Sequence, residues 1–130
     1  MNVLEAIKEK ELLSQPHPAT DEQVNSAENI LNTTFSDDFR DYLKTYGTIA
    51  YLGHELVGIS DTEYLNVVNA TSEERDFVEN IPKVWYVVER LNVDGIVIWQ
   101  SSSGEIYQTA PNSEPKKIYD SLAEYIEMEE

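Results

Sequence analysis

The spacing of apolar residues in this 130-residue chain changes at Gly47, and that change limits the folds available to it. Before Gly47 the apolar side chains recur at helical spacing. After it come short runs rich in β-branched and aromatic residues, the strongest at 84–88 and 96–99. A helical pattern returns at the end. N-terminal helices, a meander of strands and a C-terminal helix indicate an α+β fold with a largely antiparallel β-sheet.

Capping signals set the expected starts of the helices. Thr20 with Gln23 and Ser121 with Glu124 form capping boxes, and Ser36 is placed to cap a third helix. We expect helices near 3–13, 21–32, 37–46, 72–80 and 121–128, and strands in 49–59, 84–89, 95–100 and 105–108. Segment 49–59 contains two short strands with a turn at 53–55, and 64–69 is left unassigned.

The length predicts a single domain, 1–130, with one hydrophobic core. The expected core residues lie on the apolar faces of these elements: Val24, Leu31, Phe39, Tyr42, Leu43, Leu56, Val87, Ile96, Ile98, Ile106, Leu122 and Ile126. Trp85 and Trp99 lie on the strongest strands, and core packing is their favoured role.

Charge restricts the possible partners. Twenty-five acidic residues against nine basic ones give a net charge of −16, spread over the whole length. The negative electrostatic field of this charge repels phosphate backbones and anionic membranes, so we expect neither nucleic acid nor a membrane as a partner. The charged stretch Lys8–Glu11 stands where a signal peptide would be apolar, which predicts a cytoplasmic location.

The residues that usually carry chemistry are sparse. His17 and His54 are the only histidines and cysteine is absent, so neither a metal nor another cofactor is expected. We expect His54 to be an exposed turn residue, and the clustered Asp37, Asp38 and Asp41 to be solvated near a helix N-terminus. No nucleophile motif surrounds the serines at 101–103. The sequence therefore predicts a protein that is not an enzyme.

The order of several short motifs resembles the SUKH superfamily of immunity proteins, which includes the Smi/Knr-type cell-wall regulators of fungi. The resemblance begins with the helix that opens at Thr20 and continues through 35–43, Tyr46-Gly47, 55–59, 95–99, 104–107 and 120–126. Ser36 replaces a usual proline, and Tyr46 a usual asparagine. The resemblance implies a single SUKH-like domain that acts as an antitoxin against a polymorphic toxin, often a nuclease. It also implies a protein that binds a partner and catalyses no reaction, because the family is known for binding.

A toxin that cleaves nucleic acid needs a basic groove, and an acidic inhibitor can occupy it. We therefore expect a cognate basic toxin protein as the partner, contacted by acidic residues at strand ends and turns: Glu55, Asp61, Glu63, Asp94 and Glu105. Two alternatives stay open. One is an intracellular adaptor of the Smi/Knr type, and the other is a small hydrolase that uses Asp61, Glu63 and Glu105.

Overall fold

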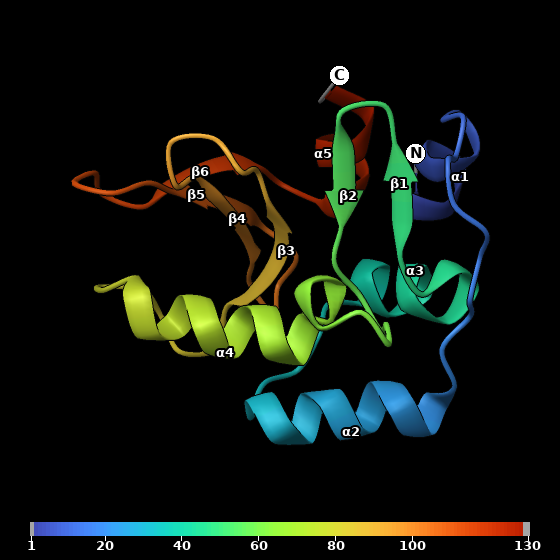
Figure 1. Cartoon of the computed structure of the whole chain (residues 1–130), viewed down its shortest axis with the longest axis horizontal. Helices are drawn as coiled ribbons and strands as arrows, with labels where there is room; N and C mark the ends of the chain where they lie inside the picture. The colour runs from blue at the N-terminus through green and yellow to red at the C-terminus, as the bar shows by residue number, and fades with distance from the viewer. Residues whose placement is uncertain (1, 129–130) are drawn as a thin grey trace.

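A computed structural model of the chain describes residues 2–128 (Figure 1). The helices are α1 (Val3–Lys8), α2 (Asp21–Leu31), α3 (Asp37–Tyr46), α4 (Val67–Phe77) and α5 (Leu122–Met128), with a 3-10 turn, η1 (Glu63–Leu65). The strands are β1 (Ile49–Tyr51), β2 (His54–Leu56), β3 (Tyr86–Arg90), β4 (Val97–Gln100), β5 (Ile106–Thr109) and β6 (Lys116–Tyr119). This arrangement confirms the predicted α+β class.

The strands form an antiparallel hairpin, β1–β2, and a four-stranded antiparallel sheet in the order β3-β4-β5-β6. The register of β3 shifts between Val87 and Glu89, so Val88 has no partner in β4. The carbonyl oxygen of Val88 instead accepts a 2.8 Å hydrogen bond from the backbone N–H of Val57, which follows β2. This irregularity joins the hairpin to the edge of the larger sheet.

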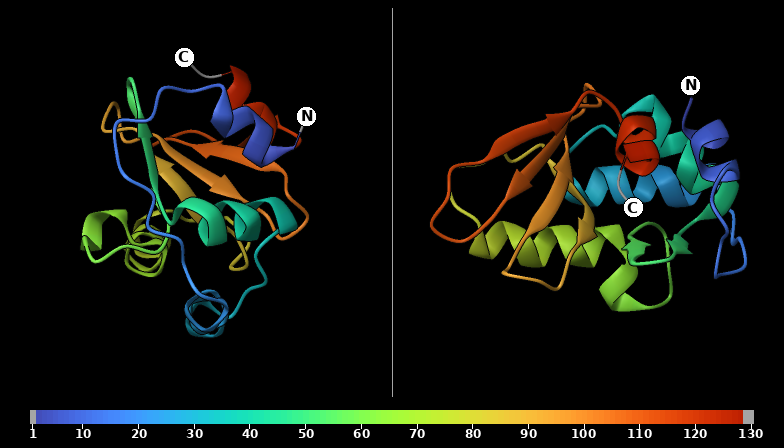
Figure 2. Two further views of the ribbon diagram at one scale, coloured as in Figure 1. Left: turned by 90° about the vertical axis from the view of Figure 1, so that its right-hand side faces the viewer. Right: turned by 90° about the horizontal axis from the view of Figure 1, so that it is seen from above.

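Helices surround these two sheets. Helix α2 packs on α3 and α4, and α4 runs beside β3. Helices α1 and α5, from opposite ends of the described chain, pack against each other, as Figure 2 shows. Among residues 2–128, no helix combines the length and the apolar character that crossing a bilayer requires.

The predicted caps of α2 and α3 are confirmed. The Thr20 hydroxyl accepts a hydrogen bond from the Gln23 N–H, and the Gln23 side chain accepts one from the Thr20 N–H. The Ser36 hydroxyl accepts from the Phe39 N–H at the start of α3. Helix α3 ends at Gly47, whose φ is +76° and where an added Cβ would lie 2.1 Å from the His17 carbonyl oxygen. Only glycine satisfies both constraints there.

Helix α5 has two caps, one of which the sequence did not predict. The Ser121 hydroxyl accepts from the Glu124 N–H, as expected. Asp38 was expected to be solvated, but it is half-buried and its Oδ2 accepts from the Leu122 N–H at 2.9 Å. Its other oxygen accepts from the Gln100 amide at 3.0 Å. Asp38 therefore connects α3 to β4 and α5.

Two predicted helices have different bounds in the structure. Helix α1 ends at Lys8, where a turn at Glu9 and Lys10 follows, and the Leu13 N–H then donates to the Ala50 carbonyl of β1. Helix α4 begins at Val67, capped by Asn66, whose side chain accepts from the Val68 N–H. Thr71 therefore lies within α4, where its buried hydroxyl accepts a 3.0 Å hydrogen bond from the Val87 N–H.

Strand β6 was not predicted. Its side chains alternate poorly, with two exposed lysines followed by two half-buried residues, and Pro115 precedes it. Pairing with β5 forms this edge strand despite the weak pattern.

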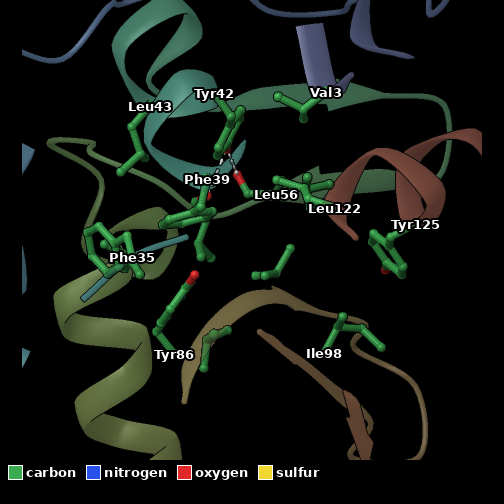
Figure 3. Packing of buried hydrophobic residues seen from close by; sticks show 14 of the residues in the cluster. Val3, Phe35, Phe39, Tyr42, Leu43, Leu56, Tyr86, Ile98, Leu122 and Tyr125 are labelled. Atoms are coloured by element: carbon green, nitrogen blue, oxygen red, sulfur yellow. Dashed lines mark hydrogen bonds between the residues drawn. The ribbon is translucent and has the colours of Figure 1, made fainter. Parts of the chain in front are cut away.

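The core contains every predicted member except Ile96, which is half-buried beside it because it precedes β4. Trp85 and Trp99 are buried, as expected. Figure 3 shows the aromatic centre, where Phe35, Phe39 and Tyr86 lie with ring centroids 4.8–5.0 Å apart. The Tyr86 hydroxyl lies 2.9 Å from the Gln100 side-chain oxygen and accepts a hydrogen bond from the Ser36 N–H. The polar atom of this buried ring is thereby satisfied.

Candidate protein-binding surface

Three of the five predicted contact residues lie on segments that meet at one cavity. This hairpin cavity has a volume of about 530 Å³ and lies between β1–β2, η1 and the end of β3. Glu55 lines it directly, Glu63 precedes the lining residue Tyr64, and Asp94 lies in the β3–β4 turn two residues after the lining Asn92. All three carboxylate residues are exposed.

Tyr64 connects the segments that border the hairpin cavity. Its hydroxyl donates to the Asn92 side-chain oxygen, which joins η1 to the β3–β4 turn. The guanidinium of Arg90 lies 4.2 Å from the centre of the Tyr64 ring and donates to the Tyr64 carbonyl oxygen at 2.8 Å. Exposed Asp61, on the loop between β2 and η1, lies three residues before this aromatic.

The inner wall of the hairpin cavity is a buried polar cluster that corrects the prediction for His54. This residue is buried, and its Nδ1 lies 2.9 Å from Glu89 Oε1. The Tyr125 hydroxyl donates to the same Glu89 oxygen at 2.6 Å, and the Glu55 N–H donates to the other at 3.0 Å. His54 points inward because the hairpin turn is at 52–53, so His54 opens β2 instead of lying in the turn.

Glu105 lies apart from this group, immediately before β5. Its carboxylate accepts a hydrogen bond from the Tyr107 hydroxyl at 3.0 Å and lies 3.3 Å from the Lys117 ammonium. These two partners, the Tyr107 hydroxyl first, lower the pKa of Glu105. The Tyr107 ring stacks on Trp85 at a centroid distance of 4.1 Å. The charge of Glu105 is thus already engaged within the molecule.

Two further cavities are present. The first, which we call the α4 groove, has a volume of about 730 Å³ and lies between the C-terminal end of α4 and the turns that follow β3 and β5. The second, of about 540 Å³, lies between α2 and the start of α4. Asp61, Glu63 and Glu105 line none of these three cavities. Among residues 2–128, no group of three or more His, Asp or Glu side chains is arranged to hold a metal ion.

Sequence reasoning did not single out the α4 groove. Its walls come from segments far apart in the chain. The sequence pattern around Phe77 indicates only the end of an amphipathic helix and does not show that this side chain is exposed. The only signal in the sequence is the residue type of Asn80 and Asn112, because asparagine favours turns. In the structure both have positive φ values and lie in the turns on either side of the groove.

Most of the cations in the described chain are already bound. Arg40 pairs with Glu28 at 2.6 Å and Lys44 with Asp21 at 3.3 Å. Arg90 pairs with Glu73 and Glu74, and Lys117 with Glu105 and Asp120. Arg75 donates to the carbonyl oxygens of Leu31 and Trp85. Within residues 2–128, Glu55, Asp61, Glu63 and Asp94 form no ion pair with a cation.

The fold and this surface define a small α+β domain that displays unpaired carboxylates from turns and strand ends. A family model described as SMI1-KNR4 cell-wall (SUKH_5) matches residues 1–129. The chain belongs to this family, which confirms the resemblance to the SUKH superfamily. No curated protein matches the chain. SUKH domains occur in immunity proteins and in Smi/Knr-like proteins, and members of the family bind partner proteins.

Proposed function

We propose that this protein is an immunity protein that binds and neutralises a cognate polymorphic toxin with a basic, nucleic-acid-cleaving surface. The observation that carries the proposal is the excess of exposed carboxylates that have no intramolecular cation. Four of the nine cations form ion pairs among the described residues, and the unpaired carboxylates far outnumber the other five cations, so these carboxylates account for most of the net charge of −16. The family supports a protein partner, and the charge supports a basic one.

The same charge suggests how neutralisation works. Exposed Glu55, Glu63 and Asp94 project from a hairpin, a 3-10 turn and a tight turn that are fixed to the core. A basic toxin is drawn to such a surface, which raises the association rate, and the bound inhibitor then blocks access of the nucleic acid. The protein needs no reaction of its own for this role.

The test is binding to the product of a candidate toxin gene that neighbours this one, measured by surface plasmon resonance over a salt series. The affinity should fall steeply as salt rises. Combined charge reversal at Glu55, Glu63 and Asp94 should slow association more than it speeds dissociation. The matched control reverses Glu22, Asp41 and Glu127, three exposed carboxylates on α2, α3 and α5.

Binding that ignores both salt and the three reversals would move the interface to the exposed aromatic side chains, Tyr64 and Phe77. Failure to bind, or to protect cells from, any neighbouring toxin would overturn the antitoxin role. That outcome would favour the adaptor role, which the cell-wall description of the family also fits.

A further inference from the structure

The α4 groove combines an exposed aromatic side chain with a fixed wall. Phe77 ends α4 and is 81% exposed, although it lines the groove. The opposite wall is formed where the β3–β4 and β5–β6 turns meet, because a Cβ on Gly95 would lie only 2.9 Å from Pro111. In Figure 1, α4 and the β5–β6 turn both extend to the left beyond the rest of the molecule. The groove therefore faces outward between two projecting elements.

The charge lining the α4 groove is of one sign. Glu74, Glu79 and Glu114 line it, and no Lys, Arg or His is among the lining residues. Glu74 pairs with Arg90 at 3.3 Å. Glu79 and Glu114 have no cationic partner in the described part of the chain, and both are exposed. Two free carboxylates thus flank an apolar surface.

The other two cavities suit a cation less well. The hairpin cavity is lined by exposed Glu55, but also by His54 and Arg90, and its second carboxylate, Glu89, is buried and bound by His54 and Tyr125. The cavity between α2 and α4 is lined by one carboxylate, Glu22. Charge complementarity to a basic group is therefore strongest in the α4 groove.

We infer that the α4 groove binds an arginine or lysine side chain of the partner protein, an inference that rests on the proposed binding of a basic toxin. The aliphatic stem lies against Phe77, and the charged head faces Glu79 and Glu114. Such side chains combine an apolar stem with a charged end, and a cation also gains from an aromatic face. The volume of about 730 Å³ is ample for this ligand.

The first experiment measures toxin affinity for Phe77→Ser and for the double variant Glu79→Gln, Glu114→Gln. Each should bind at least ~10-fold more weakly, as expected when the anchor of an interface is truncated. The matched controls are Ile30→Ser, which also replaces an exposed apolar residue, and the double variant Glu22→Gln, Glu127→Gln. The controls should bind like the unchanged protein, and circular dichroism should show every variant folded.

A second experiment does not depend on the toxin. The blocked dipeptide N-acetyl-leucyl-arginine amide, at millimolar concentration, should shift the NMR amide signals of Asn80, Gly95 and Ser113. The shifts should disappear in the Glu79→Gln, Glu114→Gln variant and with the glutamate analogue of the dipeptide.

The two experiments separate the inference from the proposed function. If the toxin binds and the groove variants retain full affinity, the groove inference is wrong while the antitoxin role stands. If no toxin binds, the antitoxin role fails and the dipeptide decides the groove. Shifts confined to the groove then support a cation site, and their absence overturns it.

Discussion

At the scale of single residues, half-buried Glu105 and exposed Glu55 differ in how available their carboxylates are to a partner. The Glu105 oxygens are bound by Tyr107 and Lys117, whereas the side chain of Glu55 has no partner among the described residues. A toxin cation that binds Glu105 must compete with these contacts. We therefore expect Glu55 to contribute more than Glu105 to toxin affinity.

The pKa of Glu105 tests this local network. Because the folded-state pKa is lowered, the contribution of Glu105 to stability is present above its ordinary value and is lost as pH falls through the lowered value. Tyr107→Phe removes the first cause of the shift, so the pKa should rise toward the ordinary glutamate range. Side-chain carboxyl NMR over a pH series measures it. An unchanged Glu105 titration in the variant would contradict the assignment.

His54 shows why the sequence could not predict some residues of the candidate surface. Its partner Glu89 is 35 positions away and reaches it because β2 packs beside β3. The position of Glu89 depends in turn on the shift in register just before it, and such irregularities redirect side chains. Neither the register nor the irregularity leaves a local signal. The exposed carboxylates at turns were predictable, because turn position and charge are local properties.

At the scale of elements, α3 carries much of the core, and Leu43 tests its role. Leu43 is fully buried, and its side chain packs where a Cβ on Gly58 would lie 3.1 Å away. Leu43→Ala should lower the free energy of unfolding by about 2–5 kcal/mol, measured by urea denaturation. Thr45→Ala, at an exposed position of the same helix, should change it by less than ~0.5 kcal/mol. A similarly small effect at Leu43 would contradict its place in the core.

Elements whose boundaries are encoded locally were predictable, and those defined by tertiary pairing were not. Helices α2 and α3 have their own caps and apolar faces, and both start where the sequence indicates. Strand β6 forms because β5 provides a partner, and α4 starts early because Asn66 caps it. Thr71 has the sequence pattern of a helix cap, but it lies inside α4 and its hydroxyl accepts a hydrogen bond from the Val87 N–H of β3. A capping residue is a reliable signal when no distant backbone group competes for its hydroxyl.

At the scale of the whole molecule, the excess of acidic residues bears on solubility. The isoelectric point is about 4.3, and Leu52 and Phe77 are more than four-fifths exposed. Near that pH the repulsion between copies disappears while these apolar side chains stay at the surface. We expect a solubility minimum near pH 4.3, measured by turbidity, that is weakened in a Leu52→Ser, Phe77→Ser double variant. Equal turbidity of the two proteins would show that these side chains do not drive association.

The pairing of α1 with α5 bears on the order in which the molecule folds. Helix α1 has six residues, too few to persist alone, and its buried Val3, Ala6 and Ile7 require α5 and α3. The contact joins segments separated by nearly the whole chain. The entropic cost of bringing them together is smallest after the sheet has formed and placed α5. We therefore expect α1 to dock late in folding. Native-state hydrogen exchange should then place its amides in the unit that opens first, and slow exchange of these amides would contradict late docking.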